Sequence, residues 1–164
     1  MTIPTMTGLQ VKNAMTRHPF AIDPEAPVAT AVAVMREREL RHLPVIDETG
    51  RLVGMLSDRD LRCAAFAPAL AEHLSPAAQR RLRGLSHALE NLRVKHVMTW
   101  DVLTIGPEAL LAQAAAIMYE AHVGSLPVVE NGRLVAMVTE RDVLKMLAQT
   151  LVPVRGIDPD TYLW

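Results

Sequence analysis

The chain repeats itself, and this duplication constrains its fold more than any other feature. Segments near its start return 83 residues later, and after one deletion the offset becomes 82. The matched segments are 11–16 with 94–99, 22–26 with 105–109, 43–45 with 126–128, and 50–53 with 132–135. Two copies of one unit can bury a common core, so we expect two related units packed about a pseudo-twofold axis.

Each repeat predicts the same order of elements, which is strand, helix, strand, strand, helix. A proline after the first apolar run predicts a brief strand, and apolar residues at helical spacing predict the first helix. In the second repeat, Asn131-Gly132 is a strong hairpin signal. The second helices are expected to begin at Ser57 and Thr139. The predicted first strands are 20–22 and 103–105, the first helix is 27–39, and the next strands are 43–46 and 51–56. The fold class is therefore mixed α/β (α+β), with a three-stranded sheet in each unit.

Both second helices begin with a hydroxyl three residues before a carboxylate. Ser57 precedes Asp60 in this way, and Thr139 precedes Asp142. Such a pair resembles a capping box, which needs no ligand. The same position is also favourable for an anion, because free backbone N–H groups and the helix dipole meet there. Capping and ligand binding can coexist.

Composition narrows the class of protein. The chain has 164 residues, a formal net charge of -1 and 50% hydrophobic residues, so no broad electrostatic field favours nucleic acid or an anionic membrane. The single cysteine, Cys63, excludes an intramolecular disulfide. No segment resembles a signal peptide or a membrane span, and we expect a cytoplasmic protein. The six histidines lack metal-binding spacing and no catalytic motif is present, so neither a metal site nor an enzyme is expected.

Three segments lie outside the repeats. Residues 1–10 predict a loosely docked N-terminal arm, and the apolar end of the 151–164 tail predicts docking of that tail. The insert at 67–93 carries leucines at spacings of three and four, which predict an amphipathic helix. That helix is expected to pack on the module or at a dimer contact. A nucleic-acid contact is the alternative, weakened by its few positive charges.

The repeated motifs together resemble a tandem pair of CBS (cystathionine β-synthase) domains, often called a Bateman module. The resemblance rests on the Val-x-x-x-Met-Thr start, the central Leu-Pro-Val, and the Gly-x-Leu-Val finish that leads into Ser/Thr-x-Arg-Asp. It places the first CBS repeat at 11–66 and the second at 94–150. The known fold of this family agrees with the predicted order of elements.

The resemblance implies an adenosine-containing ligand, AMP, ADP, ATP or S-adenosylmethionine, in clefts between the two repeats. The motif carboxylates would accept the ribose hydroxyls, and the arginines beside them could reach phosphates. Apolar residues around the Met-Thr and Leu-Pro-Val segments would hold the base, although core packing also explains Leu40 and Val123. The residues implied are Thr16, Phe20, Ala21, Leu40, Arg41, His42, Ser57, Arg59, Asp60, Thr99, Leu103, Thr104, Val123, Gly124, Ser125, Thr139, Arg141 and Asp142. One site can combine residues from both repeats, and the sequence leaves open which.

The two repeats differ at matched positions of this set. Arg41 and His42 correspond to Gly124 and Ser125, so only the first repeat can supply positive charge to a phosphate there. The implied function is a regulatory sensor that needs no cofactor and transmits ligand occupancy to an unidentified protein, with a homodimer expected. The alternative is a ligand-free module for dimerisation or protein interaction.

Overall fold

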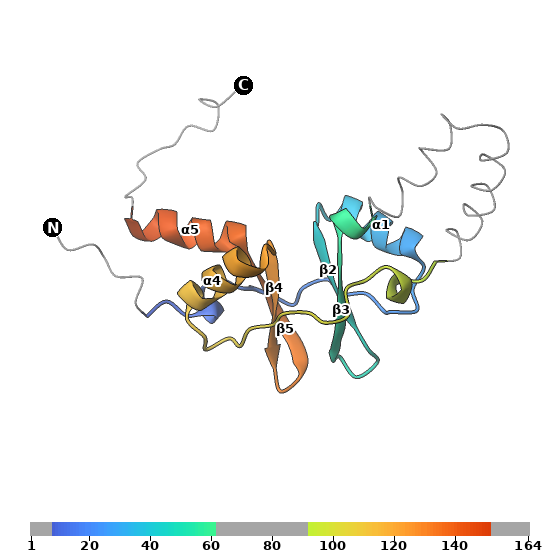
Figure 1. Ribbon diagram of the computed structural model, residues 1–164, viewed down its shortest axis with the longest axis horizontal. Coiled ribbons are helices and arrows are strands. Elements are labelled where there is room, and N and C mark those ends of the chain that lie inside the picture. Colours follow the sequence, from blue (N-terminus) through green and yellow to red (C-terminus); the bar gives the residue numbers. More distant parts are fainter. Residues whose placement is uncertain (1–7, 62–91, 152–164) are drawn as a thin grey trace, which may run out of the picture. The chain divides into compact units, whose positions relative to one another are not determined.

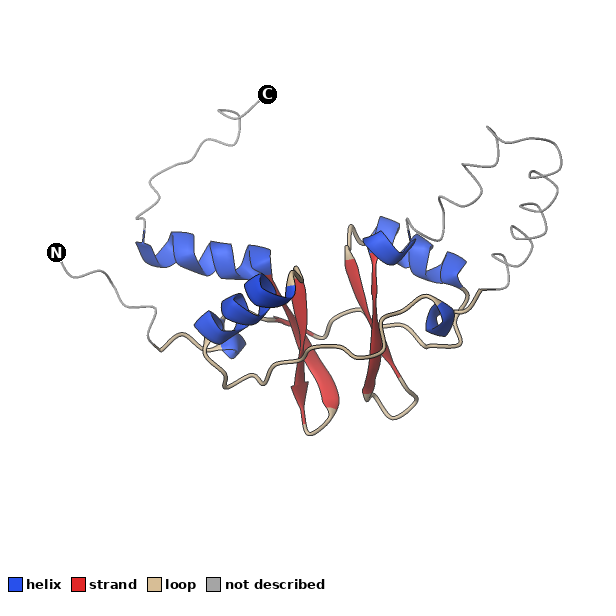
Figure 2. Ribbon diagram, in the orientation of Figure 1, coloured by secondary structure: helices blue, strands red, loops and turns tan. Residues whose placement is uncertain are grey.

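The computed structural model describes residues 8–61 and 92–151 (Figure 1). This part of the chain contains both helices and strands (Figure 2). The elements are η1 (Val11–Asn13), β1 (Thr16–Arg17), α1 (Val28–Glu37), β2 (His42–Ile46), β3 (Leu52–Ser57), η3 (Val94–His96), α4 (Leu111–Ala121), β4 (Ser125–Glu130), β5 (Arg133–Thr139) and α5 (Glu140–Leu151). Residues 67–91 of the insert, most of the N-terminal arm and nearly all of the C-terminal tail lie outside the described residues.

The chain forms two compact units, and neither unit consists of one repeat. Within the described residues, unit 1 comprises 8–17, 104–130 and 135–151, whereas unit 2 comprises 18–61, 92–103 and 131–134. The start of each repeat therefore packs with the helix and strands of the other repeat. The duplication is visible in the sequence, but this exchange of segments is not.

Unit 1 is built on a three-stranded sheet with the strand order β1-β5-β4. β1 pairs antiparallel with β5, with Thr16 opposite Met137 and Arg17 opposite Ala136. η1 is held before this strand by two backbone bonds, from Val11 N to Ala109 O and from Lys12 N to Pro107 O. The buried core of unit 1 comprises Val11, Ile105, Leu111, Ala114, Met118, Leu126, Val128, Ala136 and Val138.

Unit 2 is built on the β2–β3 hairpin, which forms a two-stranded sheet, so the prediction of three strands in each unit is wrong for unit 2. β2 and β3 pair antiparallel, from His42 opposite Ser57 to Ile46 opposite Leu52. The start of the second repeat docks here, because Met55 and Thr99 each donate a backbone N–H to the other's carbonyl at 2.9 Å. The buried core of unit 2 comprises Ile22, Ala31, Met35, Leu43, Val45, Leu56, Val94 and Met98.

Most predicted elements are present with small shifts of their ends, but the predicted brief strands are shorter. Each shrinks to one bridging residue, with Ile22 parallel to Val45 and Ile105 parallel to Val128. α1 ends at Glu37, two residues before Glu39 adopts a φ of 54°. A left-handed residue of this kind stops a helix. In the second hairpin Asn131 and Gly132 both have positive φ, as expected of a tight two-residue turn.

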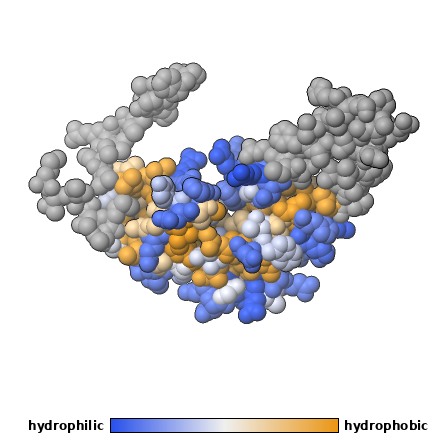
Figure 3. Space-filling model, viewed as in Figure 1, coloured by the Kyte–Doolittle hydropathy of each residue, from blue (hydrophilic) through white to orange (hydrophobic). Residues whose placement is uncertain are grey.

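Apolar and polar side chains both reach the surface, and Figure 3 shows them mixed on the face in view. The large apolar side chains left exposed are Phe20, Val32, Trp100, Leu103, Leu110, Tyr119 and Leu144. Across 8–61 and 92–151, no helix has the length and apolar character required to cross a bilayer.

Candidate functional site

In unit 2 the motif that ends β3 forms a reciprocal capping box. The Asp60 carboxylate accepts two hydrogen bonds at Oδ2, from Ser57 N at 2.8 Å and from Ser57 Oγ at 2.6 Å. In return, Asp60 N donates to Ser57 Oγ at 3.3 Å. Both residues are half-buried. The capping interpretation is therefore confirmed, and both bonds to the carboxylate use only one of its two oxygens.

Unit 1 reproduces this geometry where β5 runs into α5. Thr139 N and Thr139 Oγ1 donate to Asp142 Oδ2 at 2.9 and 2.7 Å. Asp142 N donates to Thr139 Oγ1 at 3.3 Å. Thr139 and Asp142 are also half-buried, so the two units hold equivalent carboxylates in equivalent hydrogen-bonding arrangements.

In each unit, a backbone hydrogen bond joins the capping box to the residue before the first hairpin strand, which is β2 in unit 2 and β4 in unit 1. In unit 2, Asp58 N donates to Arg41 O at 2.9 Å. In unit 1, Glu140 N donates to Gly124 O at 3.0 Å. This bond brings together, within each unit, two groups of predicted site residues that are distant in sequence. In unit 2, His42 also lies beside the capping box, because it pairs with Ser57 across the β2–β3 ladder.

The Met-Thr segments lie in the units of the opposite repeats. Thr16 pairs with Met137, two residues before Thr139. Thr99 pairs with Met55, two residues before Ser57. Thr16 lies in unit 1, whereas Phe20 and Ala21 lie in unit 2. Thr99 lies in unit 2, whereas Thr104 lies in unit 1.

The predicted base-binding residues fall into two groups by exposure. Leu40 and Val123 pack against the buried cores of units 2 and 1, as the core-packing interpretation expected. Phe20 and Leu103 are 49% and 50% exposed, and both lie in unit 2. The Arg38 guanidinium lies 4.6 Å from the centre of the Phe20 ring. No motif in the sequence indicated Arg38, because this contact depends on how α1 ends.

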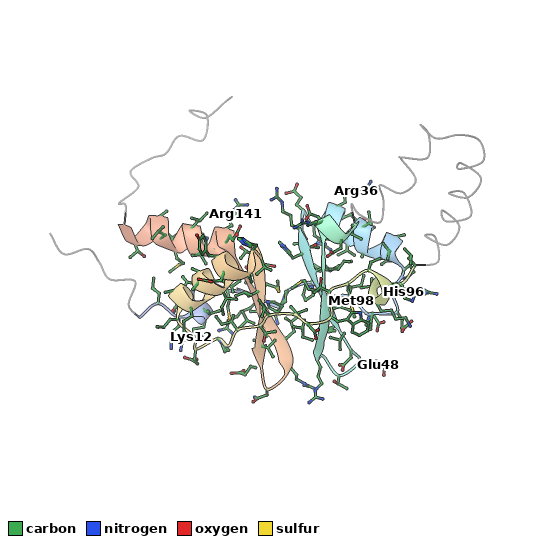
Figure 4. All side chains as sticks on the ribbon, viewed as in Figure 1. Lys12, Arg36, Glu48, His96, Met98 and Arg141 are labelled. Carbon is green, nitrogen blue, oxygen red and sulfur yellow. The ribbon has the colours of Figure 1, made fainter. Side chains whose placement is uncertain are left out.

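The arginines of the motif reach solvent. Arg59 and Arg141 are exposed, and neither has an ion-pair partner within the described part of the chain. Arg141 is labelled in the first turn of α5 in Figure 4. Each arginine lies between two acidic residues, Asp58 and Asp60 in unit 2, and Glu140 and Asp142 in unit 1.

Gly54 allows the second-repeat start to approach β3 closely. A Cβ at this position would lie 2.5 Å from Met98 Sδ and 3.0 Å from Thr99 O. In unit 1 the corresponding residue is Ala136, which is fully buried opposite Arg17. Met98, labelled in Figure 4, was not among the predicted site residues. Its position in the repeated Met-Thr motif was the available signal.

No group of three or more histidine, cysteine, aspartate or glutamate side chains in the described ranges could hold a metal ion. Hydroxyls, carboxylates and arginines at helix starts are instead the polar groups available in both units.

Residues 11–66 and 94–149 each match the sequence model of the CBS domain. The chain belongs to the CBS domain family. It is a tandem CBS pair, or Bateman module, with a mixed α/β fold. A CBS domain-containing protein of Dictyostelium discoideum is 32% identical over 145 residues, covering 88% of this chain and 94% of the relative.

Solved structures of CBS proteins are also similar to this chain along most of its length. CBSX2 in complex with AMP is 28% identical, with a TM-score of 0.71, covering 87% of this chain and 98% of CBSX2. CBSX2 from Arabidopsis thaliana, also 28% identical, gives a TM-score of 0.69.

Enzymes that match this chain do so over a minor part of their length. Inosine-5′-monophosphate dehydrogenase of Staphylococcus epidermidis is 31% identical over 139 residues, which cover 83% of this chain but 24% of the enzyme. The Dictyostelium CBS domain-containing protein and CBSX2 are instead matched along nearly their whole length. The present chain is accordingly a non-catalytic CBS pair.

Proposed function

We propose that the protein is a regulatory sensor whose two units each bind an adenosine-containing ligand at the capping-box carboxylate. The observation that supports this most is the way in which Asp60 and Asp142 are used. Their capping bonds occupy Oδ2, which leaves Oδ1 as an acceptor at a half-buried helix start. The cap fixes the carboxylate in advance, so a ligand loses little entropy in ordering it.

A ribose suits this carboxylate. Its vicinal hydroxyls are donors, and a hydrogen bond to a charged group contributes about 1.5–3 kcal/mol. A 5′-phosphate would meet the exposed motif arginines, Arg59 in unit 2 and Arg141 in unit 1. The half-exposed Phe20 and Leu103 supply apolar surface for a base in unit 2. CBSX2, which is 28% identical to this chain, has been solved in complex with AMP, and this supports AMP as the first ligand to test.

Regulation would follow from where the ligand binds. The Asp142 carboxylate, the Thr139 hydroxyl and the first residues of α5 belong to one turn of helix. A ligand that bonds to this turn favours the conformations in which it is formed. We propose that a partner protein reads this change, and that the module acts as a homodimer.

The test is calorimetric titration of AMP, ADP, ATP and S-adenosylmethionine into the wild-type protein and into Asp60→Asn and Asp142→Asn. Asparagine keeps an oxygen that can accept the Ser57 or Thr139 amide, but its NH₂ group cannot accept a ribose hydroxyl. We expect each variant to weaken binding at its own unit at least tenfold, the equivalent of about 1.4 kcal/mol. The melting temperature without ligand should change little.

The control is Glu48→Gln, which removes an exposed carboxylate in the turn between β2 and β3 (Figure 4). Equal binding by the wild type and both asparagine variants would refute the assignment of these carboxylates. A ligand that binds the native state raises the melting temperature as its concentration rises. A flat response to all four compounds would favour the alternative, a ligand-free interaction module.

A further inference from the structure

α5 in unit 1 carries apolar side chains on two adjacent sides, and only one of these sides packs on the core. The second side, which we call the outer face, consists of Leu144, Leu147 and Ala148. We propose that the C-terminal segment 152–164 turns back after α5 and docks on this outer face. The docking surface is separate from the capping-box carboxylates, so this inference does not depend on ligand binding.

The two apolar sides of α5 have different surroundings. Val143 and Met146 pack against the buried core of unit 1. Leu147 and Ala148 follow Leu144 by three and four positions, so the three residues share one side of the helix. Leu144 is 62% exposed, Ala148 is exposed and Leu147 is half-buried. Although α4 packs beside α5 (Figure 1), the outer face is therefore left largely open to solvent.

The sequence after α5 is long enough to cover this face. Pro153 cannot continue the helix, and Gly156 tolerates the left-handed conformations that reverse the direction of a chain. Residues 157–164 span up to about 26 Å when extended, whereas the 12 residues of α5 rise about 18 Å. A segment that reverses near Gly156 can therefore run back along the whole of α5.

The chemistry of this segment complements the outer face. Residues 162–164 read Tyr-Leu-Trp, and aromatic side chains bury large apolar areas on contact. Two carboxylates, Asp158 and Asp160, precede them. Lys145, next to Leu144 on α5, is exposed and has no ion-pair partner within 8–61 and 92–151. The segment thus offers apolar side chains for the leucines and negative charge for the lysine beside them.

A second copy of the chain fits the outer face less well. A stable protein–protein interface needs about 800 Å² from each partner. The outer face is one side of a single helix, about 18 Å long and about 10 Å wide. Its area suits a short peptide segment and is too small to hold a dimer together.

Tryptophan fluorescence of the full chain tests this docking. The chain has two tryptophans, Trp100 and Trp164, so the Trp100→Phe parent keeps Trp164 as its only tryptophan. We expect Trp164 in this parent to be shielded from quenching by acrylamide. Adding Leu144→Gln should raise the quenching constant severalfold, because the outer face loses its most exposed leucine. The melting temperature should change little, since Leu144 is already mostly exposed.

Two further variants accompany this measurement. Ala148→Gln places a polar side chain at a second exposed position of the outer face and should also raise the quenching constant. Val32→Gln is the matched control, because Val32 is likewise an exposed apolar residue on a helix, but in unit 2. It should leave the quenching of Trp164 unchanged.

Three results would overturn the proposal. If Trp164 in the parent is quenched as readily as a free tryptophan derivative, the segment is not docked. If shielding is the same in the parent, Leu144→Gln and Ala148→Gln, the segment docks away from α5. If shielding is lost when the protein is diluted, the segment binds a second copy and not its own chain.

Discussion

Two ion pairs at equivalent positions show how single residues hold the exchanged segments. In unit 1, Lys12 Nζ lies 2.7 Å from Glu108 Oε2, and in unit 2, Lys95 Nζ lies 2.6 Å from Glu25 Oε1. Each pair joins the start of one repeat to the loop before the first helix of the other. The backbone bonds beside them are also matched, so the same docking is built twice.

The Glu25–Lys95 pair predicts a pH dependence. The hydrogen bond from Lys95 holds the pKa of Glu25 below its ordinary value of 4.5. A carboxylate with a depressed folded-state pKa contributes stability above its unfolded pKa and loses it as pH falls through the folded value. Glu25→Gln should therefore lower the melting temperature slightly at pH 7. This difference should shrink as the pH falls below the ordinary pKa of 4.5 and vanish once the pH is below the depressed pKa of Glu25.

Thermal denaturation of both proteins between pH 3 and 8, in low salt, measures this difference. Glu48→Gln removes an exposed turn carboxylate without an ion pair in the described ranges and serves as the control. A Glu25→Gln deficit that persists unchanged in acid would mean that lost packing, and not lost charge, causes it.

At the scale of elements, sequence patterns were sufficient to predict those features that depend on contacts between residues close together in the chain. The hydroxyl and carboxylate of each capping box are three residues apart, and the Asn131-Gly132 turn is decided by backbone conformation. The first strands depended on distant partners and shrank to Ile22 and Ile105. The pairing of each Met-Thr segment with its strand also depends on residues distant in sequence. The sequence does not predict this pairing, because the two copies of the motif are nearly identical.

The start of the second repeat packs closely against β3 at Gly54. Replacing Gly54 with a larger residue is therefore expected to destabilise the folded protein. An added methyl group would lie 2.5 Å from Met98 Sδ and 3.0 Å from Thr99 O, so the docked segment must shift. Overpacking of this kind costs about 1–3 kcal/mol. Gly54→Ala should therefore lower the free energy of unfolding by that amount in urea denaturation.

Gly106→Ala is the matched control, because a Cβ there meets nothing within 4 Å and the backbone does not have positive φ. It should unfold at the same urea concentration as the wild type or slightly above. If Gly54→Ala is as stable as Gly106→Ala, then Met98 moves aside without cost and Gly54 has no packing role.

At the scale of the whole molecule, the repeats of the sequence and the compact units of the structure divide the chain differently. The duplication predicted two related units, and the family match confirms two CBS repeats. It could not show that Val11 is buried in the core with α4, or that Val94 is buried in the core with α1. A repeat taken alone would lack the segment that completes its own core.

The exchange of segments between the repeats predicts which elements a core substitution destabilises. Val94 is fully buried, and truncating it to alanine leaves a cavity in unit 2 that costs about 2 kcal/mol. In Val94→Ala, native-state hydrogen exchange should rise most in α1 and in the β2–β3 hairpin, although these elements belong to the other repeat. Val11→Ala is the reciprocal variant, and its exchange should rise most in α4 and β4. If each variant instead loosens the helix of its own repeat, the segments are not exchanged in solution.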